Sequence, residues 1–363
     1  MCGHHVQGPD MRTLAFCLAS LLLAGPLSAQ NELAERIDRY MQERVARDHF
    51  SGSVLVARDG QVLFQQGYGL ANREWNTVNS PDTKFRIAST TKQFTAAAIL
   101  LLQEKRLISV HEPVVQYLPD LPAAWRTVTV HQLLLHTSGI PNYTPQSETA
   151  RLDVLGTSPQ GLVDLVKDMP LGFEAGTKRL YSNTNYALLG MIVERVSGLS
   201  YADFVDQFLL APLGLKNTGF DWPDRITLHR AAPYRWDADG WKNVQQEAAT
   251  VMYSAGGLYS TVGDLFHWEE AMHRDGLLSA ASRSAMFTAY PETTDGAQSE
   301  GYGVIVAMDH KQPVQIATGN ATGYSSAVFY YPESKISVVV LSNSHRSAVV
   351  PVASALAGFV LSR

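Results

Sequence analysis

Strand-forming sequence occurs at both ends of this chain of 363 residues, and no other feature constrains its fold as strongly. Near the beginning, residues 53–65 have the pattern of a hairpin around the turn Asp59-Gly60. Near the end, residues 328–341 form a second strand pair around Pro332-Glu333-Ser334. Strands so far apart are expected to pair in one antiparallel sheet, while the helix-rich middle forms a second lobe. The sequence therefore predicts an α/β (α+β) fold.

Two helices are well marked by their apolar patterns. One has Gly198 as its stop signal and an i, i+3, i+4, i+7 stripe formed by Leu189, Ile192, Val193 and Val196. The other covers residues 348–361, which are apolar on nearly every side. At 14 residues this stretch is too short to span a membrane. We expect it to be a helix packed on the sheet.

The N-terminal region has the features of a secretory signal peptide. Met11-Arg12-Thr13 precedes an apolar stretch over residues 14–24, and Leu27-Ser28-Ala29 follows. We expect residues 1–29 to be removed by cleavage near Ala29, which predicts a secreted or periplasmic protein with no membrane span in its mature form. A transmembrane anchor, the alternative, would need a longer apolar stretch. Residues 1–10 are polar, which favours a true start at Met11.

Composition argues against several classes of function. A content of 45% hydrophobic and 17% charged residues is that of an ordinary soluble enzyme, and a net charge of −5 without a Lys/Arg cluster argues against nucleic acid as a partner. Both cysteines, Cys2 and Cys17, fall in the predicted signal peptide, so no disulfide or catalytic thiol is expected in the mature chain. The histidines show no H-E-x-x-H spacing, and we predict neither a metal nor a cofactor. The α/β-hydrolase motif G-x-S-x-G is also absent.

The tetrad Ser89-Thr90-Thr91-Lys92 places a hydroxyl and an amine three residues apart, just before helix-forming sequence. Residues i and i+3 share a helix face, so the amine can approach the serine oxygen. A serine hydroxyl needs a neighbouring base, and lysine serves as one only when burial or a helix N-terminus lowers its pKa. The spacing alone is weak support, because a helix start with an exposed lysine has the same pattern.

Two further elements lie downstream. In an extended segment, side chains at i and i+2 point to the same side, so the phenol of Tyr181 and the carboxamide of Asn183 are expected to face one cleft. A phenol can transfer protons, and an amide can hold a carbonyl. Residues 317–326 (ATGNATGYSS) then lead into a strand, where glycines allow a substrate to lie against a sheet edge. Each element also has a plain structural explanation, a surface tyrosine before a helix and a glycine-rich start to a strand.

In this order, the three elements resemble those of the serine β-lactamase and penicillin-binding-protein superfamily. The likeness is strongest to its class C and β-lactamase-related branch, whose second motif is Tyr-x-Asn. It extends from about Leu33 to the C-terminus and includes several other segments: residues 50–56 (FSGSVLV), 131–141 (HQLLLHTSGIP), 212–215 (PLGL), 255–265 (AGGLYSTVGDL) and 330–332 (YYP).

The resemblance implies an antiparallel sheet flanked by helices, formed by residues 30–105 and 291–363, with an all-helical domain inserted at 106–290. The active site would lie in the cleft between them. Ser89 would be the nucleophile, and Lys92 and Tyr181 would share the proton transfers, with the choice of base between them open. The backbone N–H groups of Ser89 and Asn320 would form the oxyanion hole. The substrate-binding residues implied are Asn183, Thr318, Gly319 and Asn320.

One position departs from the family pattern. The third motif normally begins with Lys or His two residues before its glycine, and this chain has Ala317 there. A lost charged hydrogen bond costs ~1.5–3 kcal/mol, whereas enzymes lower barriers by at least ~8 kcal/mol. The change is therefore expected to alter substrate preference and leave catalysis intact.

These observations predict a secreted serine hydrolase that acts on small-molecule or peptide substrates with ester or amide bonds and no obligatory carboxylate. One alternative is a non-catalytic penicillin-binding-like protein that has kept the fold. The other is a true class C-type β-lactamase or D-alanyl-D-alanine carboxypeptidase. The sequence leaves the oligomeric state open.

Overall fold

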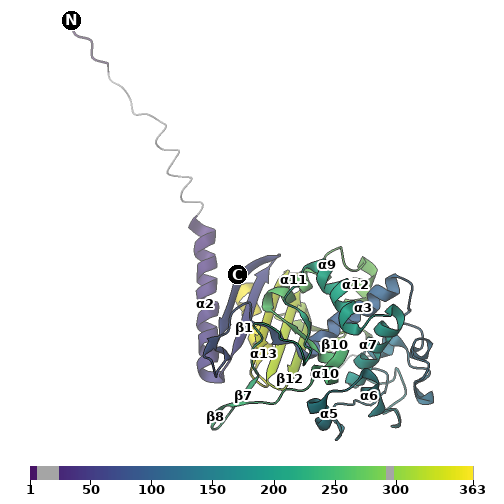
Figure 1. The fold of residues 1–363 in the computed structure, drawn as a ribbon. Coiled ribbons are helices and arrows are strands. Elements are labelled where there is room, and N and C mark those ends of the chain that lie inside the picture. Colours follow the sequence, from purple (N-terminus) through teal and green to yellow (C-terminus); the bar gives the residue numbers. More distant parts are fainter. Residues whose placement is uncertain (6–23, 292–297, 363) are drawn as a thin grey trace.

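A sheet of seven strands forms the centre of the protein (Figure 1). The computed structural model describes residues 1–5, 24–291 and 298–362. Every neighbouring pair of strands in this sheet is antiparallel, and the contact between β1 and β14 joins the two ends of the chain. The predicted α/β class, with an antiparallel sheet flanked by helices, is confirmed. The stretch 106–290 was expected to be all-helical, and this was wrong, because four short strands lie in it between residues 219 and 260. In spatial order, the strands are β10 (Gln298–Glu300), β11 (Ile305–Asp309), β12 (Gln312–Ala321), β13 (Tyr324–Tyr331), β14 (Ile336–Ser342), β1 (Gly52–Arg58) and β2 (Gln61–Tyr68).

Both predicted hairpins form. Asp59 and Gly60 connect β1 to β2 with φ angles of 50° and 76°. Positive φ at both central residues is what a two-residue turn needs to match the twist of its strands, which explains the Asp-Gly pair. The connection from β13 to β14 runs through Pro332-Glu333-Ser334, as the sequence indicates.

The strands bury side chains on both faces of the sheet. Alternate residues of β1 separate into two cores, with Val54 and Val56 on one face and Leu55 and Ala57 on the other. Helices α2 (Ala24–Asp48) and α13 (Val349–Leu361) cover the first face. The apolar C-terminal stretch is therefore a helix packed on the sheet, as predicted.

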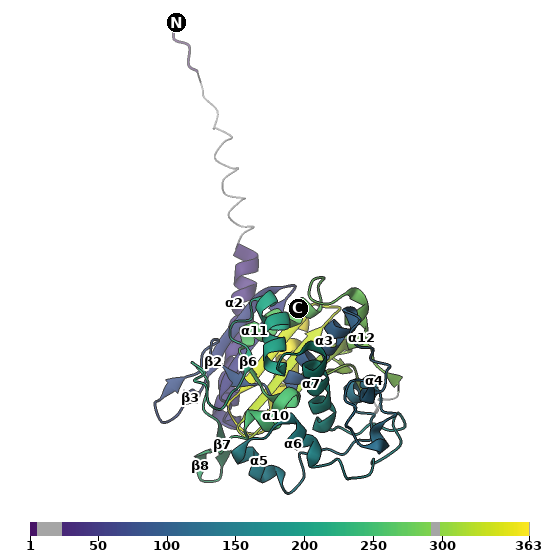
Figure 2. The same ribbon diagram turned by 45° about the vertical axis from the view of Figure 1, so that its right-hand side comes forward.

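The second face carries the larger core, which includes most of the residues of α3 (Thr91–Glu104). Figure 2 shows the position of this helix. Helix α3 contacts α7 (Asn183–Ser197) and α10 (Ala249–Gly256), and α7 ends at Gly198 in the left-handed conformation that stops a helix. Helix α11 (Val262–Met272) packs directly on β1 and β14, although its sequence falls in the stretch assigned to the helical insertion. The domain boundaries at 105/106 and 290/291 stay a prediction.

Short elements complete the chain. Strand β9 (Leu258–Ser260) pairs with β5 (Phe85–Arg86) and β6 (Gly219–Phe220) in a small sheet that leads directly into α3. The remaining elements are β3 (Leu70–Asn72), β4 (Thr77–Val78), β7 (Tyr234–Asp237), β8 (Gly240–Asn243), η1 (Ala88–Thr90), η2 (Val114–Gln116), η3 (Ala123–Trp125), α4 (Val130–Leu134), α5 (Thr149–Leu155), α6 (Pro159–Asp164), α8 (Tyr201–Val205), η4 (Asp206–Leu210), α9 (Ala211–Leu213) and α12 (Ala280–Phe287).

The predicted signal peptide is only partly described. Residues 6–23, which hold most of its apolar stretch, lie outside the described residues, and Ala29 falls within α2. Across the described ranges, none of the helices is both long and apolar enough to cross a membrane. Cleavage near Ala29 and export stay predictions.

Candidate active site

Ser89 lies in the turn where strand β5 passes into helix α3. The preceding residue, Ala88, is fully buried and has a φ of 46°, a left-handed conformation that costs a non-glycine residue about 1–2 kcal/mol. The turn is held from the sheet by Ser326 on β13, whose hydroxyl donates to the carbonyl of Ile87 at 2.7 Å and is hydrogen-bonded to Thr90 at 2.8 Å. These contacts fix the serine at the N-terminus of α3.

Lys92 lies one turn further along and is only 3% exposed. Its Nζ is 3.1 Å from Ser89 Oγ, and it donates to Asn183 Oδ1 and to the carbonyl of Ala255, both at 2.8 Å. All three partners are neutral oxygens. Burial lowers the pKa of Lys92 to about 7, against a smaller opposing effect of the Glu300 carboxylate. The amine is therefore substantially neutral near pH 7.

Asn183 holds this lysine from inside the protein. It is the first residue of α7, and its carboxamide nitrogen donates to Thr144 Oγ1 at 2.8 Å while its oxygen accepts from Lys92. Its backbone N–H donates to Asn142 Oδ1 at 3.1 Å. The side chain is 6% exposed, so in this structure it positions the lysine from a buried place.

Tyr181 closes the cleft over the serine. Its hydroxyl is 2.7 Å from Ser89 Oγ. The residue as a whole is 37% exposed, but desolvation of the hydroxyl inside the cleft raises the pKa of Tyr181 to about 12, so the phenol is protonated at neutral pH. Its ring lies 4.5 Å from the ring of His136, whose Nδ1 accepts the backbone N–H of Ser182 at 3.2 Å. Burial, reinforced by Lys92 and Arg179, keeps the pKa of His136 well below its ordinary value. The imidazole is thus a neutral support for the tyrosine.

Backbone strain is found on several sides of this cluster. In addition to Ala88, His136 has a φ of 60°, and Tyr253 has φ 40° and ψ −134° inside α10. Tyr253 stands two residues before Ala255, whose carbonyl accepts from Lys92. Such conformations persist where the surrounding structure enforces them, and they are common at functional sites.

The third predicted element, the end of β12, lies against the N–H of Ser89. A Cβ added at Gly319 would stand 2.8 Å from that nitrogen and 2.2 Å from the carbonyl oxygen of Ile87, so only glycine fits. Ala321 pairs with Tyr324 across a two-residue turn, which makes them a hydrogen-bonded pair. The next pair, Asn320 with Ser325, is then non-hydrogen-bonded, and the N–H of Asn320 points away from β13. The backbone amides of Ser89 and Asn320 are both available to an oxyanion.

The structure thus brings the seven predicted site residues together at one place. Six of them contribute a side chain or a close backbone contact, and the seventh, Asn320, contributes only its backbone. Thr318 lines the cavity at the serine and Gly319 packs on the serine turn. The Asn320 side chain is exposed and accepts a hydrogen bond from Ser325 at 3.0 Å. One expectation was wrong in its geometry: Tyr181 and Asn183 do not share an extended segment, because the helix begins at Asn183.

A cavity of about 220 Å³ opens beside Ser89 and contains residues that the sequence did not single out as functional. Arg179 reaches it from the segment before Tyr181 and forms an ion pair with Glu300 at the end of β10. The arginine could have been predicted from the sequence, because Arg179 and Tyr181 are two residues apart and such side chains point to the same side of an extended segment. The lining residues are Ser89, Lys92, His136, Arg179, Tyr181, Glu300, Gly303, Val304, Ile305, Ile316, Ala317 and Thr318.

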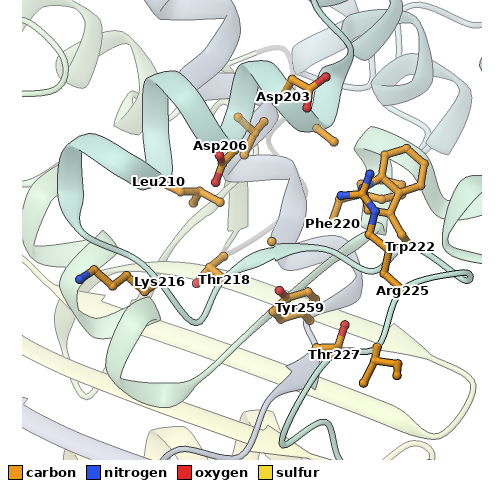
Figure 3. A pocket seen from close by; sticks show the side chains of 14 residues that line it. Asp203, Asp206, Leu210, Lys216, Thr218, Phe220, Trp222, Arg225, Thr227 and Tyr259 are labelled. Atoms are coloured by element: carbon orange, nitrogen blue, oxygen red, sulfur yellow. The ribbon is translucent and has the colours of Figure 1, made fainter.

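A separate pocket of about 360 Å³ lies among α8, η4 and strands β6 and β9 (Figure 3). Asp206, Tyr259 and Arg225 line it, and the guanidinium of Arg225 lies 5.3 Å from the ring centre of Trp222. None of the residues around Ser89 takes part in it. In the described part of the chain, no group of three or more His, Cys, Asp or Glu is placed to hold a metal ion.

The chain is similar to several known proteins. A family model described as Beta-lactamase matches residues 37–360. Penicillin-binding protein 4* of Bacillus subtilis (strain 168) is 30% identical over 319 residues, which cover 82% of this chain and 69% of the relative. Two further curated relatives are covered over 64% of their length, so the chain spans roughly two thirds of these proteins.

Solved structures show the same fold. The octameric penicillin-binding protein homologue from Pyrococcus abyssi superposes with a TM-score of 0.79 at 29% identity, covering 91% of this chain and 77% of that one. A penicillin binding protein from Bacillus halodurans gives a TM-score of 0.78 at 27% identity, covering 89% and 98%. The similarity extends over nearly the whole described chain.

Proposed function

Since this chain belongs to the beta-lactamase family of serine hydrolases, we propose that it cleaves ester or amide bonds through an acyl-enzyme formed on Ser89. The main support is the environment of Lys92. A buried amine with a pKa of about 7, 3.1 Å from a serine hydroxyl, is a base that can act near neutral pH. No carboxylate is paired with it in the described ranges that would hold it protonated.

The geometry around Nζ directs its lone pair. A neutral amine has two N–H donors, and the two fixed acceptors, Asn183 Oδ1 and the Ala255 carbonyl, take both. The lone pair is then left for the proton of Ser89. Tyr181, with a pKa of about 12, is too weak an acid to be present as phenolate, so we assign the base role in acylation to Lys92.

The remaining steps follow from the same contacts. Ser89 Oγ attacks the carbonyl carbon, its proton passes to Lys92 Nζ, and the oxyanion receives the N–H groups of Ser89 and Asn320. Each such donor is worth ~2.7–4 kcal/mol in the transition state. The leaving group takes a proton through the Tyr181 hydroxyl, which is 2.7 Å from Ser89 Oγ. Water then attacks the acyl carbon and gives up a proton through the Tyr181 hydroxyl. Ser89 Oγ leaves and takes back its proton from Lys92 Nζ.

We propose neutral esters and amides as the preferred substrates. Ala317 contributes no charge to the cavity wall, and the one cation beyond Lys92 among the described lining residues, Arg179, is already paired with Glu300. A carboxylate on the substrate would therefore find no unpaired cation there. The names of the relatives make penicillins the second candidate acyl donor.

Intact-mass spectrometry after incubation with a fluorophosphonate, a p-nitrophenyl ester and a penicillin tests both candidates. We expect one phosphonyl adduct and rapid ester turnover, with slow or no turnover of penicillin. Ser89→Ala should lose the adduct and about 10⁴–10⁶-fold of the turnover, with an unchanged circular dichroism spectrum. Esterase activity that survives Ser89→Ala at its original rate would overturn the assignment. Penicillin bound covalently without ester turnover would favour a binding protein.

We also propose that the protein acts outside the cytoplasm. Met11-Arg12-Thr13, the apolar residues 14–24 and Leu27-Ser28-Ala29 support export with cleavage near Ala29. N-terminal sequencing of the protein from culture supernatant and periplasm should give a start near Gln30. A protein that begins at Met1 and stays in the cytosol would contradict export.

A further inference from the structure

Two charged side chains from distant parts of the chain meet in the wall of the Ser89 cavity. Arg179 belongs to the segment before α7, and Glu300 is the last residue of β10 in the sheet, so their ion pair crosses the cleft. The arginine side chain is 29% exposed and the glutamate side chain 11%. The arginine is therefore the more accessible member of the pair.

The strand register places this pair beside Ala317. Glu300 lies opposite Ile305 on β11, and Ile305 lies opposite Ile316 on β12. Strand β11 begins at Ile305, so within the described part of the chain β12 has no strand partner on that side beyond Ile316. The free edge at Ala317 and Thr318 and the carboxylate of Glu300 therefore border the same cavity.

Stability alone gives a poor account of the pair. Burying two charges costs desolvation that their attraction often fails to offset, so such pairs are weak contributors to folding. Burial raises the pKa of Glu300, which shows that the carboxylate is held against its solvation preference, with Arg179 and Lys92 opposing that shift. In addition, the Nε of Arg179 is buried with no hydrogen-bond acceptor among the described residues. The guanidinium thus has a donor that Glu300 leaves unsatisfied.

We propose that Arg179 and Glu300 form a specificity-determining pair in which Glu300 stands in for a substrate carboxylate. While Glu300 is paired with the guanidinium of Arg179, a substrate whose leaving group carries a carboxylate is repelled by the Glu300 carboxylate beside the free edge of β12. Such a substrate is therefore disfavoured. Neutral substrates are unaffected by this competition. Arg179, in the segment before α7, is the side chain of the cavity that can bind a substrate carboxylate once Glu300 no longer neutralises it. Ala317 cannot take this role, because it carries no charge. This inference rests on the proposed acyl-enzyme at Ser89.

The test uses a substrate pair that differs by one carboxylate, phenyl acetate and 3-carboxyphenyl acetate. The quantity compared is the ratio of kcat/KM for the anionic ester to that for the neutral ester, measured within each variant at pH 8. Glu300→Gln keeps the shape of the side chain and a hydrogen bond to Arg179, and it removes the charge. We expect this variant to raise the ratio about tenfold to a hundredfold, as expected for one new charge-assisted hydrogen bond.

The double variant Arg179→Gln/Glu300→Gln identifies the receptor. Because it lacks the guanidinium, we expect its ratio to return to within about threefold of wild type. Asp164→Asn is the control for net charge. It removes the carboxylate of the last residue of α6, which forms a surface ion pair with Lys167, and it should leave the ratio unchanged. A gain that persists in the double variant, or that appears equally in Asp164→Asn, would overturn the assignment of Arg179.

The two hypotheses fail differently. If wild type gives no phosphonyl adduct on Ser89, the proposed function fails and the pair loses its meaning. If Ser89 is labelled and phenyl acetate is hydrolysed, but Glu300→Gln leaves the ratio unchanged, only the specificity assignment is wrong. If Glu300→Gln does not fold, Glu300→Ala replaces it with the same expected direction. If that also unfolds, the pair is essential to folding and the specificity role is rejected.

Discussion

Two cations in one cleft are held in opposite ways. Lys92 is buried among three neutral oxygens, and burial lowers its pKa to about 7. Arg179, on the opposite wall, is more exposed and carries a carboxylate partner, Glu300. On one side of the cleft, burial favours the neutral form of the Lys92 amine. On the other side, Arg179 keeps its positive charge, and the Glu300 carboxylate neutralises it.

The difference follows from the chemistry of the two side chains. A buried cation without a partner releases its proton where it can, and lysine can do so within a protein. Arginine keeps its proton, so a partly buried guanidinium needs an anion. A base therefore has to be a lysine without a carboxylate, whereas a group that recognises charge is better made from arginine. The experiments below test this division of roles.

Among these experiments, the largest effect is expected at Lys92. Lys92→Met removes the base, and Lys92→Arg replaces it with a group that cannot lose its proton, so both should lower kcat/KM for phenyl acetate by about 10²–10⁴-fold. Stopped-flow acylation rates, with circular dichroism to verify folding, measure this. A Lys92→Arg enzyme that acylates at near wild-type rate would show that the charge of Lys92 matters rather than its basicity, and the base would then be Tyr181.

A somewhat smaller loss is expected at Gly319, because there the two walls touch. An alanine Cβ would stand 2.2 Å from the Ile87 carbonyl and must push β12 away from the serine turn. Gly319→Ala should widen the oxyanion hole and lower kcat about 10²–10³-fold. Unlike changes at Arg179, it should affect neutral and anionic esters equally.

Gly263→Ala is the matched control for this substitution. At Gly263, on α11, the nearest atom to an added Cβ is 4.0 Å away, so this variant should retain full activity. A Gly319→Ala enzyme as active as Gly263→Ala would mean that the packing of β12 on the serine turn does not control the oxyanion hole.

The lowered pKa of Lys92 should also appear in the pH dependence of stability. Between pH 7 and 10.5, the lysine is protonated in the unfolded chain and largely neutral in the folded one, so the unfolded state binds more protons and stability rises with pH. Burial raises the pKa of Glu269 to about 8, which has the opposite effect below that pH, so the test starts at pH 8.

From pH 8 to 9.5, the free energy of unfolding should rise by about 2 kcal/mol more in wild type than in Lys92→Met. Urea unfolding at the two pH values measures this difference. In the same way, kcat/KM should rise with pH around a midpoint of about 7. Identical pH slopes of stability in the two proteins would mean that Lys92 stays protonated in the fold.

Much of the fold could be predicted from the sequence because its signals are local. The Asp59-Gly60 turn, the apolar residues of β13 and β14, and the Gly198 stop each arise from neighbouring residues. The strands β10 and β11 were missed, because they are short and only partly apolar, and each is defined by its pairing in the folded sheet, β10 with β11 and β11 with β12. The packing of α11 on the sheet was missed because periodicity does not tell which surface an apolar face will cover.

The candidate site divides in the same way. Ser89, Lys92 and Tyr181 could be found because they stand in short motifs with a chemical meaning. Glu300 could not, since it meets Arg179 only after the chain has folded, 121 residues further on. The position of Asn183 was judged from strand geometry, although the helix stripe after it already indicated that α7 was about to begin.

The smallest expected effect concerns Ala317, where a second cation can be added to the wall that holds Arg179. Ala317 is 6% exposed and lines the cavity next to Thr318, so a lysine there must extend towards the open space beside Glu300. Ala317→Lys should raise kcat/KM for 3-carboxyphenyl acetate about tenfold, and it should change kcat/KM for phenyl acetate little, because a neutral ester offers no charge to bind.

When Ala317→Lys is combined with Glu300→Gln, the gain in kcat/KM should be less than the product of the single gains, since one carboxylate cannot be held fully by both cations. Equal gains for both esters would show that the new lysine acts on Lys92 or Ser89 and that the wall at residue 317 does not contact the leaving group.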